Sequence, residues 1–267
     1  MISLVTLLKE VSSSPKAIIL AGAPGAGKSS IVGDLISDAG IKTLNIDDHF
    51  IKNLKDLEVS LDLKKAGPED RSKAAVAMQK AQKTYQDELN QEIQQNNHIV
   101  IDGTAASYKK TEDLKNTLEN AGYEVLMVYV YSSLEKSLRK NEDRFERSKG
   151  EDRSLMPGIV MQTWANVTKN FIPYLNLFGG NFIATTKDKE LADAKTLDDI
   201  VKIYLEPFTP KDTKPKTPAQ QRSSEKQLQK TNDDIKKLMS KEQVEQHLQH
   251  IVSPEEAQSK ITQFLQS

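Results

Sequence analysis

The sequence contains no cysteine, and it has no apolar run long enough to cross a membrane. The first absence excludes disulfide bonds, and it excludes zinc and iron–sulfur sites that use cysteine ligands. The second leaves no segment near the ~20 apolar residues that a membrane-spanning helix needs. A formal net charge of -1 indicates no bulk attraction to nucleic acid, although a local basic patch could still bind one. We therefore expect a soluble, cytoplasmic protein that does not contact membranes.

Residues 1–15 are mildly apolar but do not resemble a secretion signal. They lack a positively charged leading region, and their apolar run stops at Lys9 and Glu10. No small-residue cleavage site follows. We predict a short amphipathic helix here.

Five short apolar runs lie within residues 1–208. They are continuous rather than alternating, which is typical of strands buried on both faces in a parallel sheet. We predict five strands, at 17–21, 42–46, 98–102, 123–131 and 181–185. Helical patterns lie between or after them, at 28–39, 71–95, 109–120, 133–147, 159–177 and 197–205. This alternation predicts a doubly wound α/β domain over residues 1–208, with helices on both faces of the sheet.

The composition changes after Phe208. Residues 209–226 are rich in proline, lysine and small polar residues, and we predict a linker there. Residues 227–267 are polar but carry helix-start signals at Ser240 with Gln243 and at Ser253 with Glu256. Such short helices are not stable alone. We expect this helical C-terminal extension to dock on the main domain, on a protein partner or on a second copy of the chain.

A phosphate-binding loop follows the first predicted strand. The motif G-x-x-x-x-G-K-[ST] is complete, with a strand before it and a helix after it. Glycines let backbone N–H groups surround phosphate oxygens, and the following helix adds its positive dipole end. Lys28 would reach the β- and γ-phosphates of ATP, and Ser29 would bind Mg²⁺. The expected nucleotide-binding residues are Gly22, Ala23, Pro24, Gly25, Ala26, Gly27, Lys28, Ser29 and Ser30.

Other features of the sequence favour phosphoryl transfer over hydrolysis. No Asn-Lys-x-Asp guanine signature occurs, which argues against a GTPase. The third predicted strand ends at Asp102, and Gly103 follows where ATP-hydrolysing motors usually carry a water-activating glutamate. We therefore expect an ATP-dependent kinase with a hydroxyl acceptor. The alternative is a nucleotide-binding interaction protein whose C-terminal helices bind a partner.

Arginines cluster after the fourth predicted strand, where a lid would be expected. Cations that close over ATP would screen the charge of the transferred phosphoryl group and exclude water. The alternative is a solvated helix in which each arginine pairs with a nearby carboxylate. We expect at least two of the four to act on phosphate, with Arg144 and Arg147 as first choices. The four are Arg139, Arg144, Arg147 and Arg153.

The order of these motifs over residues 16–177 resembles the P-loop kinases that include zeta-toxin-like kinases and the 5′-polynucleotide kinase domain. The resemblance implies a five-stranded parallel sheet with the P-loop strand at its centre. It implies that Asp47 is the base toward the acceptor hydroxyl and that Asp102 with Thr104 binds substrate. It places Arg144 and Arg147 in a lid that precedes Pro157. Phe50 stands where polynucleotide kinases carry an arginine for the acceptor's phosphate, so the acceptor stays open among a sugar nucleotide, a nucleoside and a modified nucleic acid.

Two adjacent carboxylates, Asp47 and Asp48, follow the second predicted strand. Strand alternation would turn them to opposite sides, so we expect Asp47 to be the catalytic base and Asp48 to support substrate binding. Asp102 would hold Mg²⁺ together with Ser29, or it would hold the acceptor. His247 and His250 lie three positions apart on the extension, and we interpret them as packing residues rather than zinc ligands.

Overall fold

The computed structural model describes residues 14–63, 66–149, 151–153, 155–188 and 240–267, together with isolated positions between 196 and 233. The expected helices at 1–15 and 197–205, and the boundaries of the linker at 209–226, lie outside these residues. Six parallel strands form one sheet in the order β2-β3-β1-β4-β5-β6. The strands are β1 (Lys16–Ala21), β2 (Lys42–Asn45), β3 (Ile99–Asp102), β4 (Glu124–Tyr131), β5 (Phe182–Thr186) and β6 (Ile251–Val252).

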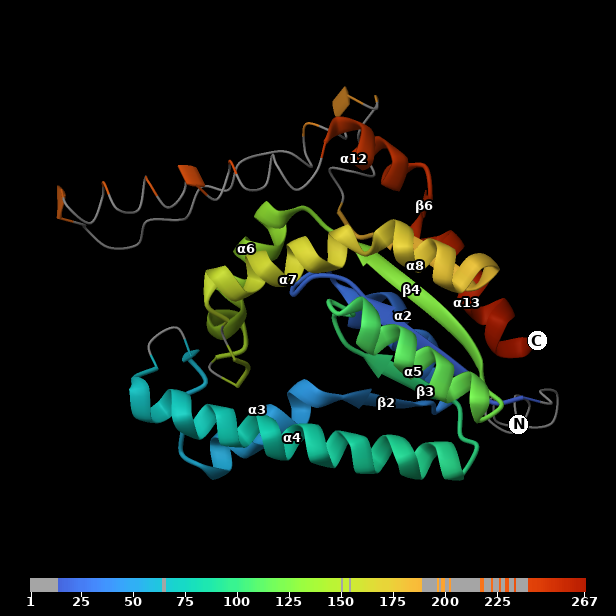
Figure 1. Cartoon of the computed structure of the whole chain (residues 1–267), viewed down its shortest axis with the longest axis horizontal. Coiled ribbons are helices and arrows are strands. Elements are labelled where there is room, and N and C mark those ends of the chain that lie inside the picture. The colour runs from blue at the N-terminus through green and yellow to red at the C-terminus, as the bar shows by residue number, and fades with distance from the viewer. Residues whose placement is uncertain are drawn as a thin grey trace.

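Helices cover both faces of this sheet, as predicted (Figure 1). The helices are α2 (Lys28–Ala39), α3 (Ile46–Asp56), α4 (Pro68–Gln94), α5 (Tyr108–Asn120), α6 (Leu134–Arg147), α7 (Pro157–Lys169), α8 (Phe171–Phe178), α12 (Lys241–Leu248) and α13 (Pro254–Gln266). Alternate residues of β1 enter different clusters. Ile19 packs with residues of α4, α5, α7 and α8, whereas Ile18 and Leu20 pack with residues of α2 and α13. The strand that leads into the P-loop is therefore central, between β3 and β4.

The prediction of five strands was wrong, because the C-terminal extension adds a sixth. β6 runs parallel to β5, with Ala184 opposite Ile251 and Thr185 opposite Val252. Two apolar residues in a polar, helix-forming segment carry no strand signal of their own. Only the free edge of β5, which is distant in sequence, makes them a strand.

The C-terminal extension was expected to dock on the main domain, on a protein partner or on a second copy of the chain. In the structure it packs on the main domain. Ala257, Ile261 and Leu265 of α13 are buried in the cluster that contains Ile31 of α2. Both helix-start signals are present, since Ser240 accepts a hydrogen bond from the backbone of Gln243 and Ser253 does so from Glu256. The described part of the extension therefore belongs to the main core, and the boundary at Phe208 stays a prediction.

The chain also departs from the predicted elements at two turns. β2 ends at Asn45 rather than Ile46, and α3 begins at once, so Asp47 and Asp48 lie in the first turn of a helix. The predicted helix at 159–177 is two helices, α7 and α8, that break at Asn170. Pro173 accounts for the break, because its ring would clash with the carbonyl four residues earlier in a continuous helix. Among the described residues, no helix is long and apolar enough to span a membrane.

Candidate active site

The P-loop occupies the turn from β1 to α2 and can be built only from small residues. Gly22 and Gly25 have φ values of +146° and +78°, which side-chain-bearing residues rarely adopt. A Cβ atom at Gly22 would lie 2.5 Å from the carbonyl oxygen of Val130, and one at Gly25 would lie 2.9 Å from Cβ of Lys140. The close approach at Gly25 also shows that α6, the first helix of the predicted lid, packs on the loop.

Lys28 is the first residue of α2, and its side chain turns back to the loop. Its Nζ donates hydrogen bonds to the carbonyl oxygens of Gly22 and Ala23, at 3.1 and 3.3 Å. Burial lowers the pKa of Lys28, while the charges of Asp102 and Asp47 act in the opposite direction. The lysine therefore stands among the other candidate site residues, as a phosphate-binding cation should.

The two expected Mg²⁺ ligands meet because β1 and β3 are neighbours. Ser29 Oγ donates to Asp102 Oδ2 at 3.2 Å, and the amide of Asn45 lies 3.5 Å from the same oxygen. Adjacent ligands of an octahedral Mg²⁺ ion lie about 3 Å apart when its bonds are near 2.1 Å, so this pair fits the ion. No cluster of three acidic or histidine ligands occurs among the described residues.

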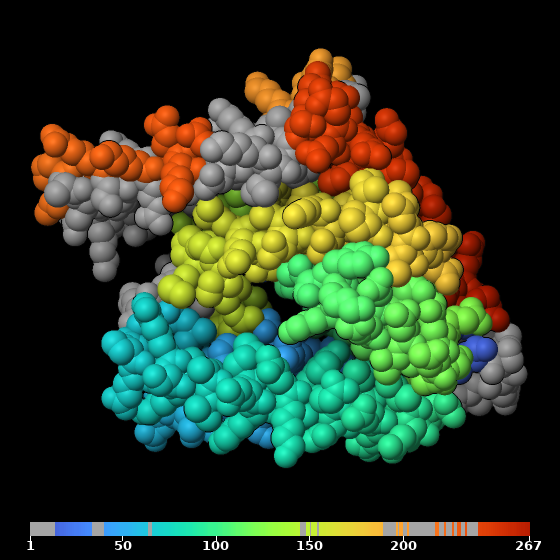
Figure 2. Space-filling model, viewed as in Figure 1, coloured from blue at the N-terminus to red at the C-terminus, as the bar shows by residue number. Residues whose placement is uncertain are grey.

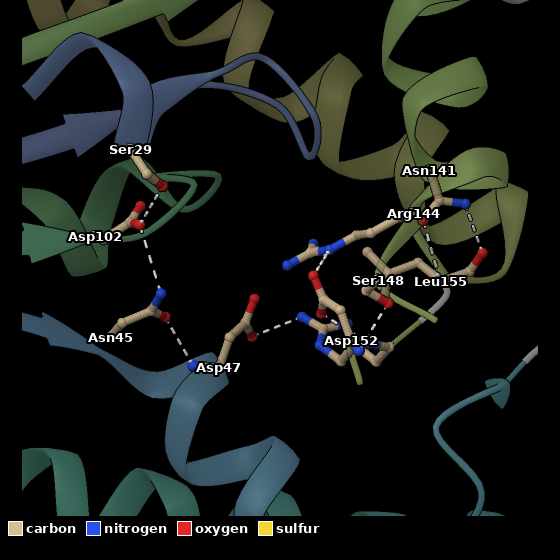
Figure 3. Close-up of polar contacts among 10 residues, drawn as sticks. Ser29, Asn45, Asp47, Asp102, Asn141, Arg144, Ser148, Asp152 and Leu155 are labelled. Carbon is tan, nitrogen blue, oxygen red and sulfur yellow. Dashed lines mark hydrogen bonds and ion pairs between the residues drawn. The ribbon is translucent and has the colours of Figure 1, made fainter. Parts of the chain in front are cut away.

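Asp47 is oriented by the helix start that the sequence did not reveal. The side-chain oxygen of Asn45, the N-cap residue of α3, accepts a hydrogen bond from the backbone of Asp47 at 2.8 Å. The carboxylate then points toward the lid (Figure 3). Asp48 is exposed and does not line the cavity that Asp47 lines. The inequality of the two carboxylates thus arises from the turn of a helix, not from strand alternation, and the role of Asp48 in substrate binding stays a prediction.

The partner of Asp47 is Arg153, the last of the four clustered arginines. Its Nη2 donates to Asp47 Oδ1 at 2.6 Å, and its guanidinium carbon lies 5.4 Å from the centre of the Phe50 ring. Phe50 therefore contacts an arginine that comes from the lid. Arg153 is one of the four arginines of the cluster but is not among the first choices, Arg144 and Arg147, because spacing along the chain does not show which side chain turns inward.

The lid segment that carries Arg153 is held by its own polar contacts. Asn141 of α6 is buried, and its amide exchanges two hydrogen bonds with the backbone of Leu155, at 2.8 and 3.0 Å. Asp152 forms an ion pair with Arg144 and accepts a hydrogen bond from the backbone of Arg153 at 2.7 Å. A polar network thus runs from the P-loop helix to the lid (Figure 3), through Ser29, Asp102, Asn45, Asp47, Arg153, Asp152 and Arg144.

The remaining arginines of the cluster differ from one another in position. Arg144 lines the cavity. Arg139 instead pairs with Glu135 one turn earlier on α6, as expected for an arginine on a solvated helix. The side chain of Arg147 lies outside the described residues. Thr104 lines the cavity, and its carbonyl accepts a hydrogen bond from the P-loop nitrogen of Gly22 at 3.2 Å.

These residues surround one cavity of about 780 Å³. Figure 2 shows the hollow between α4 on one side and α5 and α7 on the other. Its charged lining comprises Lys28, Lys140, Arg144, Arg153, Asp47 and Asp102. The apolar part of the lining comprises Ile46, Phe50, Leu63, Met78, Leu155 and Ile159. The cavity therefore combines basic, acidic and apolar side chains, and Asp47 lines the same space as the P-loop.

Comparison with solved structures shows the fold. The AvrRxo1-ORF1:-ORF2 complex has 14% identity and a TM-score of 0.51, over 92% of this chain and 83% of that one. The same complex with ATP has 14% identity and a TM-score of 0.49, over 94% of this chain and 85% of that one. A chain of the PezAT chromosomal toxin–antitoxin system of Streptococcus pneumoniae has 17% identity and a TM-score of 0.47, over 87% of this chain and 93% of that one. No curated protein sequence matches the chain.

The parallel sheet with a central P-loop strand defines a P-loop NTPase fold. The family model described as zeta toxin matches residues 5–171. The chain therefore belongs to the zeta toxin family, and this membership places it among the P-loop kinases.

Proposed function

We propose that the protein is an ATP-dependent kinase that transfers the γ-phosphoryl group to a hydroxyl of a small molecule, a nucleotide or a nucleic acid. The observation that carries this proposal is the convergence of the P-loop, Asp47 and two lid arginines on one cavity. Gly103 follows Asp102, so the cavity has no glutamate at the position that would activate water for hydrolysis. The family match supports the kinase class, and the reaction partners are part of the proposal.

In this reaction the acceptor oxygen attacks the γ-phosphorus, and the bond to the bridging oxygen of ADP breaks. Lys28 contacts the β- and γ-phosphates, while Arg144 and Arg153 offset the charge of the transferred group. Asp47 orients the hydroxyl and takes its proton late, because the transition state is loose and needs little early deprotonation. Bound Mg²⁺, held by Ser29 and Asp102, would neutralise charge on the phosphate oxygens.

The apolar lining supports a choice among hydroxyl acceptors. A free sugar needs many hydrogen-bonding partners, whereas apolar side chains, among them Phe50, Leu63 and Met78, form part of the cavity lining. The acceptor that we propose therefore presents a flat or apolar group, such as a nucleobase, beside its reactive hydroxyl. A nucleoside, a sugar nucleotide and a nucleic-acid end all meet this condition.

The proposal is tested by incubating the protein with ATP labelled at the γ-phosphate and with pools of metabolites and oligonucleotides. We expect label to appear in a new product with the native protein and to be lost with Lys28→Met. Asp47→Asn should slow transfer by about 10²-fold or more, the usual size of a general-base contribution. Asp56→Asn removes an exposed carboxylate from the end of the same helix and should leave transfer unchanged. Transfer that persists in Asp47→Asn would refute the assigned base.

The expectation of a protein partner stays a prediction. The structure does not favour the extension as its binding site, because the apolar residues Ala257, Ile261 and Leu265 of α13 already pack on the chain's own sheet and α2. A nucleotide-binding interaction protein would bind ATP without transferring phosphate to any acceptor. The labelling experiment therefore separates that alternative from the kinase.

A further inference from the structure

The candidate base and a candidate phosphate-binding arginine neutralise each other in this structure. Arg153 Nη2 lies 2.6 Å from Asp47 Oδ1, so the oxygen that should receive the acceptor's proton already accepts a hydrogen bond. The pair is partly shielded from water, with side-chain exposures of 10% for Arg153 and 30% for Asp47. A hydroxyl group that approached this oxygen would have to share it with the guanidinium, whose charge also makes the carboxylate a weaker base.

Arg153 is also incompletely satisfied in this position. Its Nε is buried and has no hydrogen-bond partner within the part of the chain that the structure describes. The guanidinium has five N–H donors in a planar fork that matches the oxygens of phosphate, and the ring of Phe50 supports one of its faces. A phosphoryl group offers more charge and more acceptor oxygens than the single carboxylate contact does.

The position of the pair makes such an exchange of partners feasible. Arg153 and Lys28 line the same cavity, and the charge of Asp47 acts on Lys28. The pair therefore stands beside the place where the P-loop would present the γ-phosphate. A guanidinium at the end of a flexible side chain can move between two anions in one cavity by rotation of its own torsions.

We propose that Arg153 is a latch with two anionic partners, Asp47 in the nucleotide-free protein and the γ-phosphate when ATP is bound. ATP binding withdraws the guanidinium and frees the Asp47 carboxylate for the acceptor hydroxyl. Nucleotide binding therefore makes the whole carboxylate available to the acceptor. This regulation rests on the proposed kinase function, because it gives Asp47 its role toward the hydroxyl.

The latch makes a prediction about ATP affinity that needs no knowledge of the acceptor. In the native protein, ATP must compete with Asp47 for Arg153. Asp47→Asn removes the competing charge while keeping the size of the side chain. Because charge-assisted hydrogen bonds are among the stronger ones in proteins, we expect the Kd of MgATP, measured by isothermal titration calorimetry, to fall by about tenfold.

Two further variants separate the latch from a simple change in charge. Asp48→Asn removes the same charge one residue away, outside the cavity, and should tighten ATP binding much less. Arg153→Met keeps an apolar stem over Phe50 and should weaken ATP binding. In the Arg153→Met background, Asp47→Asn should give no more gain than Asp48→Asn does. Circular dichroism of each variant verifies that the fold is retained.

The outcomes for the latch and for the kinase function can be distinguished. An unchanged or weaker ATP affinity in Asp47→Asn would overturn the latch, as would an equal gain in the two backgrounds. Failure of the native protein to bind MgATP would also overturn the latch, because Arg153 would then have no second anion to exchange for Asp47. Loss of labelled product in Asp47→Asn with unchanged ATP affinity would keep the kinase and reject the latch. Tighter ATP binding in Asp47→Asn without transfer to any acceptor would support the exchange of partners by Arg153 and would contradict the role of Asp47 toward a hydroxyl.

Discussion

His247 makes the docking of the C-terminal extension sensitive to pH. It lies on α12, and its ring is buried against the main domain, 4.5 Å from the ring of Phe171 in a stacked arrangement. Its Nδ1 lies 3.0 Å from the hydroxyl of Tyr131. Burial, followed by the nearby His250, lowers the pKa of His247 from 6.5 to about 4. The neutral ring therefore fits this site, and a proton on it is disfavoured.

The size of the effect follows from the two pKa values. Between pH 6.5 and 4 the unfolded chain binds a proton at His247 that the folded chain does not, so folding loses stability as the pH falls through this range. The shift corresponds to roughly 3 kcal/mol when fully expressed, and to about 2 kcal/mol at pH 5. Above pH 6.5 His247 is neutral in both the folded and the unfolded chain, so its contribution to the free energy of unfolding no longer changes with pH.

Urea unfolding at pH 7 and pH 5, followed by the fluorescence of the buried single tryptophan Trp164, measures this loss. Other groups titrate in the same range, so the informative quantity is the difference from His247→Gln, whose side chain is neutral at both pH values. The native protein should lose about 2 kcal/mol more than this variant does. His250→Gln, at an exposed histidine on the same segment, should keep most of the native loss, because burial is the larger cause of the lowered pKa of His247. Parallel losses in the native protein and His247→Gln would refute the reasoning.

Further substitutions test the core, the P-loop and the lid. Ile261→Ala on α13 should lower the free energy of unfolding by about 2–4 kcal/mol because Ile261 is fully buried, whereas exposed Gln263→Ala should change it by less than about 0.5 kcal/mol; equal urea midpoints would contradict the docking of α13. Gly25→Ala should abolish MgATP binding in calorimetry while circular dichroism stays native, because its Cβ would meet a neighbouring side chain at 2.9 Å. Asn141→Ala should remove the exchange protection of the Leu155 amide and cost about 1–3 kcal/mol, and a still-protected amide would show that Asn141 does not hold the lid.

Those parts of the site that depend on neighbours along the chain were predictable from the sequence. The P-loop motif contains its own glycines, its lysine and the start of α2, and the structure places all of them at one turn. Asp102 was predictable too, because strands of a parallel sheet end at a common edge. The start of α3 was not predicted, because Ile46 continues the apolar run of β2. The N-cap at Asn45 forms only when the backbone turns into a helix there.

The lid shows where local reasoning ends. Arg144, Arg147 and Arg153 have the same chemistry and similar neighbours in the sequence, and the resemblance to P-loop kinases pointed to Arg144 and Arg147. Arg153 reaches Asp47 because Asn141 holds Leu155 and because the ring of Phe50 supports its guanidinium. Both contacts join residues that the sequence keeps apart, so no local pattern could identify the arginine.

The sequence by itself determined the class of the protein, because the P-loop and the alternation of strands and helices are local patterns that elementary sterics and burial turn into one fold. Tertiary structure alone decided that Ile251 and Val252 complete the sheet and that Arg153 is the partner of Asp47. Each of these depends on a contact between segments distant in the chain. Their free energy comes from burial and pairing, which exist only once the chain has folded.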